Sequence, residues 1–127
     1  MKRTALLHAE LSGLVAAMGH GDLIVIGDAG LPVPAGVRCI DLAVTRGVPS
    51  VMQVLDAVLS ELVVERSSVA QQAAPELVDE FKARDIGQLG FVSHDDFKQG
   101  MASARAVIRT GECTPYANIS LWSGVAF

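Results

Sequence analysis

Cysteine is scarce in this sequence of 127 residues, which contains only Cys39 and Cys113, and neither belongs to a Cys-x-x-Cys pair. A disulfide framework or a zinc site needs several ligands at close spacing, so the sequence supports neither. His8, His20 and His94 also lack the spacing of a helical metal site. We therefore expect a reducing compartment and no metal or other cofactor.

The sequence also lacks a surplus of basic residues and any long hydrophobic run. Ten Lys and Arg residues stand against fourteen Asp and Glu residues, and the net charge of −4 disfavours binding to nucleic-acid phosphates. No stretch approaches the roughly 18 to 20 apolar residues of a membrane span, and His8 and Glu10 interrupt the short apolar stretch near the start. We expect a cytoplasmic protein with no nucleic-acid or membrane partner.

Several sequence motifs of common enzymes are missing as well. There is no G-x-G-x-x-G fingerprint, no Walker lysine and no G-x-S-x-G elbow, so nucleotide binding and serine hydrolysis have no support. No repeat or linker-like stretch divides the chain, so we expect one domain over residues 1–127. Half of the residues are apolar, a surplus that a subunit interface could use, and we therefore expect a homo-oligomer.

Helical and strand patterns alternate along the chain. Apolar spacing predicts a first helix that ends at Gly19 as a left-handed cap. Ser50 with Gln53 has the spacing of a capping box, and Ser93 with Asp96 repeats this arrangement with an acid at the third position. Residues 62–64 could end that second helix or form a short strand. The other predicted elements are strands at 22–26, 38–43, 89–92, 106–108 and 119–122, and helices from Pro75 and over 93–104. The pattern predicts an α/β layered single domain with a mixed, mainly parallel sheet flanked by helices.

His20 and Asp28 bracket the first predicted strand, with His20 at its entrance and Asp28 at its exit. A helix C-terminus before His20 would support an imidazolium and suit a proton donor, although a histidine that only caps the helix explains it equally well. Asp28 could bind a ligand or form an Asx turn before Gly30. A six-residue strand spans about 20 Å, so the two side chains cannot easily share one pocket within a chain.

Four more polar residues occur near the C-terminal part of the sequence. His94 falls in the first turn of a predicted helix, where it could hydrogen-bond a hydroxyl or simply lie in solvent, and Lys98 one turn later could be a plain exposed charge. Tyr116 and Asn118 would share one face of an extended backbone and suit sugar hydroxyls, whereas a turn before the last strand is the simpler alternative.

Five stretches in order carry a resemblance to known proteins, namely MGHGD at 18–22, GDAGLPVP at 27–34, GVPSVMQVL at 47–55, SHDDFK at 93–98 and VIRTGECTPYANI at 107–119. Together they resemble the D-ribose pyranase and L-fucose mutarotase superfamily. The match covers nearly the whole chain, and the Asp-Ala-Gly-Leu-Pro-x-Pro and Pro-Tyr-Ala-Asn stretches resemble the ribose branch.

This resemblance implies a cofactor-independent sugar isomerase that interconverts the pyranose and furanose forms of D-ribose. It implies His20 as the catalytic proton donor and a ring-like homo-oligomer, decameric in the ribose branch, with active sites at subunit interfaces and C-terminal residues supplied by a neighbour. It also implies a set of sugar-binding residues, namely Asp28, His94, Lys98, Tyr116, Ala117 and Asn118. An L-fucose-type mutarotase and a non-catalytic sugar-binding accessory subunit remain as alternatives.

Overall fold

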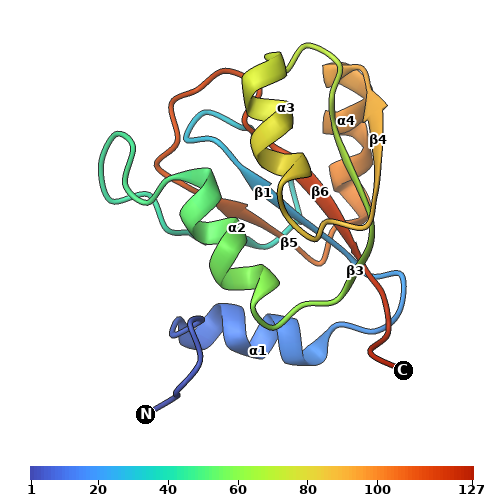
Figure 1. Ribbon diagram of the computed structural model, residues 1–127. Coiled ribbons are helices and arrows are strands. Elements are labelled where there is room, and N and C mark those ends of the chain that lie inside the picture. The colour runs from blue at the N-terminus through green and yellow to red at the C-terminus, as the bar shows by residue number, and fades with distance from the viewer.

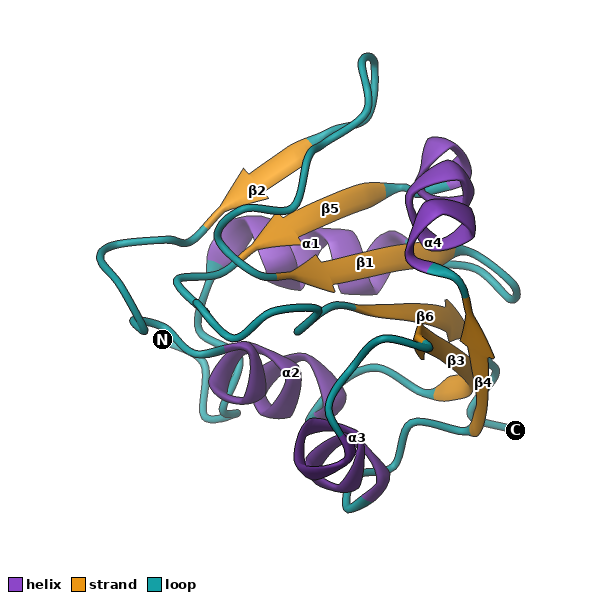
Figure 2. Ribbon diagram, turned by 90° about the horizontal axis from the view of Figure 1, so that it is seen from above, coloured by secondary structure: helices purple, strands orange, loops and turns teal.

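The computed structural model, which describes residues 1–127, contains one six-stranded sheet in the order β2-β5-β1-β6-β3-β4 (Figures 1 and 2). Three neighbouring pairs are parallel, and only β6 runs antiparallel to its neighbours β1 and β3. The mixed, mainly parallel sheet predicted from the sequence is therefore confirmed. The strands are β1 Leu23–Gly27, β2 Cys39–Asp41, β3 Val64–Ala70, β4 Gln88–Val92, β5 Ala106–Arg109 and β6 Ile119–Ser123.

Helices cover both faces of the sheet. Alternate residues of the buried strand β1 point to opposite faces, so apolar side chains on both faces must be covered. Ile24 and Ile26 pack into the larger core cluster beneath the helices α1 Ala9–Ala17, α2 Val51–Leu59 and α3 Pro75–Lys82. Leu23 and Val25 pack on the other face against Phe97 and Met101 of α4 His94–Gly100 and the 3₁₀ turn η1 Met101–Ser103. Figure 1 shows α2 and α3 in front of the sheet. None of these helices has the length and apolar character needed to cross a bilayer.

Two of the predicted helix starts are confirmed in atomic detail. The Ser50 side chain accepts from the Gln53 amide while the Gln53 side chain accepts from the Ser50 amide, which satisfies two amides that no helix carbonyl can reach. At α4 the Ser93 hydroxyl accepts from the Asp96 amide in the same way. This cap fixes His94 as the first residue of α4.

Strand β3 differs most from the sequence prediction, which placed only residues 62–64 in a possible short strand. The structure forms a strand of seven residues, whose second half is buried between β6 and β4. Ser67 and Ser68 in that half are polar, so the segment shows neither alternation nor a continuous apolar run. Pairing with strands on both sides decides the structure there, and local sequence does not show it.

Candidate functional site

His20 lies on a tight turn just before β1. The Asp22 amide donates to the Gly19 carbonyl at 3.1 Å, and Gly21 has φ +82°, which matches position three of a type II turn. The Asp22 carboxylate accepts from the Gly19 amide at 2.9 Å and pairs with Arg105 at 2.7 Å. The turn is thereby closed from both sides, and it presents the His20 ring at the surface.

The helix before His20 ends differently from the prediction. Gly19 is not a left-handed cap, because Met18 ends α1 in an extended conformation and its amide donates to the Val15 carbonyl. His20 therefore does not cap the helix, and its Nε2 lies 2.6 Å from a carboxylate oxygen of Glu65. Glu65 comes from β3, forty-five residues away, and nothing in the local sequence indicates this contact.

Asp28 follows the last residue of β1 and makes two local contacts. Its Oδ1 accepts from the Gly30 amide at 2.9 Å, which is the Asx turn considered from the sequence. Its own amide donates to Oδ1 of Asn118 at 2.8 Å. A Cβ added at Gly27 would lie 3.0 Å from that same Asn118 oxygen and 2.4 Å from Leu31, so the absence of a side chain allows this close packing.

The backbone around Asp28 is anchored by residues at the end of β5 that the sequence analysis did not single out. The amide and the hydroxyl of Thr110 both donate to the Gly27 carbonyl, at 2.9 and 2.8 Å. The Arg109 guanidinium donates to the Ala29 carbonyl at 3.1 Å and to both oxygens of Asp41. Hydrogen bonds from Arg109 hold the pKa of the Asp41 carboxyl below its ordinary range.

His94 and Tyr116 meet edge to face, with ring centroids 5.1 Å apart and an interplanar angle of 82°. The His94 ring therefore does not simply lie in solvent. The His94 backbone amide donates to the side-chain oxygen of Gln72 at 3.1 Å. Tyr116 has φ +61°, and it is the one residue other than glycine with a positive φ. Strained backbone of this kind is concentrated at functional sites because the surrounding structure must hold it in place.

The segment 116–118 forms the turn that was the simpler alternative from the sequence, and not the extended backbone on which Tyr116 and Asn118 would share one face. The Asn118 amide donates to the Tyr116 carbonyl at 2.8 Å, which closes a tight turn and directs the Asn118 side chain toward the Asp28 backbone. Ala117 between them is fully buried. Tyr116 and Asn118 therefore link His94 to Asp28, and these four residues come together within one chain.

Two buried polar atoms of this cluster have no hydrogen-bond partner in the chain, namely Nδ1 of His94 and Nδ2 of Asn118. Unpaired buried polar atoms are costly and rare, and at the end of a sheet they indicate a place for a polar ligand. Lys98 lies one turn beyond His94 on α4, where its ammonium group is 3.5 Å from a carboxylate oxygen of Asp95. No hydrogen bond or ion pair connects Lys98 with the cluster.

His20 is separated from this cluster by the length of β1. A strand of five residues spans about 17 Å, and His20 precedes the strand whereas Asp28 follows it. The C-terminal residues Tyr116 and Asn118 reach the Asp28 end within their own chain, so His20 is the residue that one chain alone does not bring to the cluster. None of the four surface pockets is lined by a member of the cluster.

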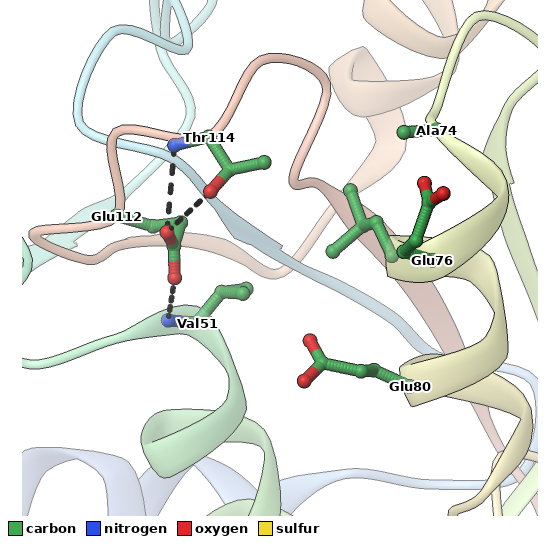
Figure 3. Close-up of a pocket in the computed structure, with 7 residues that line it drawn as sticks. Val51, Ala74, Glu76, Glu80, Glu112 and Thr114 are labelled. Carbon is green, nitrogen blue, oxygen red and sulfur yellow. Dashed lines mark hydrogen bonds between the residues drawn. The ribbon is translucent and has the colours of Figure 1, made fainter.

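The largest pocket, of about 450 Å³, lies between α2, α3 and residues 112–114 (Figure 3). Glu76, Glu80 and Glu112 line it, but only Glu112 is hydrogen-bonded there, to the Val51 amide and to Thr114. Burial raises the pKa of the Glu112 carboxyl, but these hydrogen bonds outweigh it and bring the pKa below 4.5. Glu112 is therefore an ionised helix cap, and the pocket contains none of the residues predicted to bind sugar.

No group of three or more His, Cys, Asp or Glu side chains is arranged so that it could hold a metal ion. The polar cluster instead offers hydrogen-bonding groups of mixed character: a carboxylate, a carboxamide, a phenol and an imidazole. Groups of this kind are suited to a ligand with several hydroxyls, each of which both donates and accepts.

The sequence matches the RbsD / FucU transport protein family over residues 1–126. A D-ribose pyranase of Variovorax paradoxus (strain S110) is 59% identical over 132 residues, with 100% of both chains covered. A second D-ribose pyranase, from Pseudomonas putida (strain GB-1), is 54% identical, again over 100% of both chains.

Solved structures also resemble this one. The structure of Bacillus subtilis RbsD complexed with D-ribose superposes with a TM-score of 0.94 at 39% identity, with 100% of both chains covered. The fucose mutarotase from Streptococcus pneumoniae, solved in complex with L-fucose, has a TM-score of 0.85 at 22% identity over 100% of both chains. The second likeness extends to the fold alone.

Proposed function

The chain belongs to the RbsD / FucU transport protein family, and from that premise we propose that it is a D-ribose pyranase. The observation that carries the proposal is the 59% identity to a D-ribose pyranase over the full length of both proteins. The unpaired atoms of His94 and Asn118 support a ligand with several hydroxyls at the Asp28 end of the sheet. We place this activity in the cytoplasm.

The reaction needs only proton transfers. In the first step the ring oxygen of the pyranose accepts a proton from His20 as the bond between C1 and that oxygen breaks. The anomeric hydroxyl loses its proton to a water molecule or a second polar group, which leaves an open-chain aldehyde. The C4 hydroxyl then attacks C1 and gives its proton to the neutral His20. The aldehyde oxygen takes back the proton held by the water molecule or second polar group, which gives the furanose and restores the charged His20. General acid-base help of about 10²- to 10⁴-fold is what a positioned side chain typically supplies.

Sugar binding falls to the cluster at the Asp28 end of the sheet. Oδ2 of Asp28 is the oxygen that the Asx turn leaves free, and Nδ1 of His94 and Nδ2 of Asn118 have no partner within the chain. These three atoms offer both acceptors and donors to the sugar hydroxyls. The Tyr116 hydroxyl, the Ala117 backbone and the Lys98 ammonium group complete the proposed binding set.

A second copy of the chain supplies His20 in this proposal. Asp28 and His20 lie at opposite ends of β1, so the acid and the binding cluster come together only if His20 of one subunit approaches the cluster of the next. A closed ring repeats such a head-to-tail contact around its circumference. We propose the ring-like homodecamer of the ribose branch, in which exposed apolar side chains such as Phe91 and Val48 would lie at interfaces.

The deciding experiment is saturation-transfer proton NMR on D-ribose at equilibrium, with wild-type protein, with His20→Ala and without protein. We expect wild-type protein to speed exchange between the pyranose and furanose signals. The exchange rate that His20→Ala adds should be at least 100-fold smaller, while this variant still binds ribose. Unchanged exchange on ribose together with faster anomer exchange on L-fucose would replace the pyranase proposal with the mutarotase alternative. Ribose binding without any faster exchange would indicate an accessory subunit.

A further inference from the structure

The acid His20 does not stand alone at the surface, because its Nε2 atom lies 2.6 Å from Oε2 of Glu65. Both side chains are about half exposed, at 60% and 46%, so neither is forced into contact by burial. The turn that carries His20 is fixed independently of Glu65 through Asp22, which pairs with Arg105. The contact therefore adds a constraint on the ring that the backbone of the turn does not provide.

Glu65 occupies an irregular position in β3. The register between β3 and β6 shifts between Val64 and Arg66, so Glu65 is the extra residue of a bulge. Bulges redirect a side chain out of the regular alternation of a strand, and they are over-represented next to active sites. Gly87, with φ +63°, approaches so closely that a Cβ there would lie 2.3 Å from the Glu65 carbonyl group. This contact leaves the Glu65 backbone little room to move.

We propose that Glu65 is a positioning residue for His20, and that it holds Nε2 so that Nδ1 is the atom that gives its proton to the sugar. This inference rests on the proposed function, because it assigns the atom and the orienting partner of the proposed acid. It differs from that function in being testable without turnover.

The chemistry follows from the two ring nitrogens. A carboxylate can only accept, so the Nε2 that faces it carries a hydrogen in both the neutral and the charged imidazole. Nδ1 is then the nitrogen that gains and loses a proton, with its lone pair free in the neutral form and its N–H free in the charged form. In the ring-opening step the Nδ1–H bond breaks, the ring oxygen gains that proton, and His20 is left neutral with Nε2–H still bound to Glu65.

The first measurement is the tautomer of His20 in the wild-type protein, read from long-range ¹H–¹⁵N correlation spectra at alkaline pH. The chain has three histidines, and His20→Ala identifies the signals of the one in question. We expect neutral His20 to carry its proton on Nε2, and Glu65→Ala to shift the population toward a mixture of the two tautomers. A neutral His20 protonated mainly on Nδ1 in the wild type would overturn the proposal.

The second measurement is kcat and KM for ribose exchange in Glu65→Ala and Glu65→Gln. We expect Glu65→Ala to lower kcat by about 10- to 100-fold with KM within 2-fold of wild type, since a misplaced catalytic group costs rate without removing binding groups. Glu65→Gln keeps an acceptor oxygen and should recover at least 3-fold of that loss. Its recovery also separates lost positioning from misfolding of the alanine variant.

The matched control is Glu10→Ala, which removes a carboxylate that is also 46% exposed and also paired with a basic side chain, Arg38. We expect Glu10→Ala to keep the wild-type kcat. If Glu65→Ala behaves like Glu10→Ala, the positioning role is refuted while the pyranase function stands. If the wild type shows no exchange catalysis but His20 shows the Glu65-dependent Nε2 tautomer, the proposed function fails and the Glu65 contact remains.

Discussion

The Glu112 carboxylate offers the sharpest test of how the segment before Tyr116 is held. It accepts from the Val51 amide at 3.1 Å, at the first residue of α2, and from the Thr114 hydroxyl and amide at 2.9 and 3.4 Å. The Val51 amide is one of those that no helix carbonyl can reach, and Val51 itself is buried. Glu112→Ala removes the acceptor and leaves that amide without a replacement.

The expected cost of Glu112→Ala can be worked from these contacts. A hydrogen bond to a charged acceptor contributes about 1.5 to 3 kcal/mol, and a carboxylate at a helix N-terminus about 0.3 to 1 kcal/mol. These two effects overlap at one amide, and the groups of the exposed Thr114 return to water at little cost. We expect the free energy of unfolding to fall by about 2 kcal/mol, which lowers Tm by about 6 to 12 °C in a domain of this size.

The assay is thermal and urea unfolding at a fixed protomer concentration, because assembly makes stability depend on concentration. Glu80→Ala is the control, since Glu80 lines the same pocket and carries the same charge but its side chain makes no hydrogen bond. We expect that variant to stay within about 0.5 kcal/mol of wild type. Equal stability losses in both variants would refute the argument, because the loss would then follow charge and not the helix cap.

The same substitution has a predicted pH signature. Hydrogen bonds overcome the effect of burial and hold the folded-state pKa of Glu112 below 4.5, its ordinary value. A lowered folded-state pKa stabilises the protein above the unfolded-state pKa, and this stabilisation is lost as pH falls through the folded-state pKa. The stability difference between wild type and Glu112→Ala should therefore be constant from pH 7 to about 5.5 and shrink below about pH 4.5. A difference that persists undiminished at pH 3 would contradict this.

Two further substitutions probe the proposed sugar site. In Gly27→Ala the added Cβ would meet Leu31 at 2.4 Å and the Asn118 side-chain oxygen at 3.0 Å. We therefore expect KM for ribose to rise at least 10-fold in exchange assays. An unchanged KM would exclude Asn118 from binding. Tyr116→Gly relieves a backbone strain of about 1 to 2 kcal/mol while it removes the contact with His94. We expect the free energy of unfolding of this variant to change by less than about 1 kcal/mol, and calorimetric titration to show at least 10-fold weaker ribose binding. A loss of several kcal/mol in the free energy of unfolding would mean that Tyr116 is mainly structural.

The sequence predicted those parts of the fold that local chemistry determines. Ser50 and Ser93 marked helix starts because a cap needs only the next three residues, and the apolar strand β1 was evident as a continuous run. Local chemistry could not indicate β3, whose polar residues Ser67 and Ser68 are buried by neighbouring strands. The end of α1 was also misjudged, because Gly21 in the His20 turn takes the positive φ expected of Gly19.

The candidate site shows the same division. The Asx turn at Asp28, one of the two alternatives that the sequence left open, is confirmed, and it depends only on Gly30 two positions later. The contact from Asp28 to Asn118 joins residues ninety positions apart, and the resemblance to a family was what suggested that they share a site. Glu65 belongs to no recognisable motif, so its contact with His20 became visible only in three dimensions.

The place of β6 in the sheet has a consequence for how this protein is made. β6 is the last strand in sequence, yet it lies between β1 and β3 and is the only strand that joins the β2-β5-β1 half to the β3-β4 half. Synthesis at about 5 to 20 residues per second leaves the facing edges of β1 and β3 without a partner until residues 119–123 emerge. Until β6 emerges, the facing edges of β1 and β3 are open to strands of other chains. The nascent protein should therefore depend on chaperones more than its small size suggests.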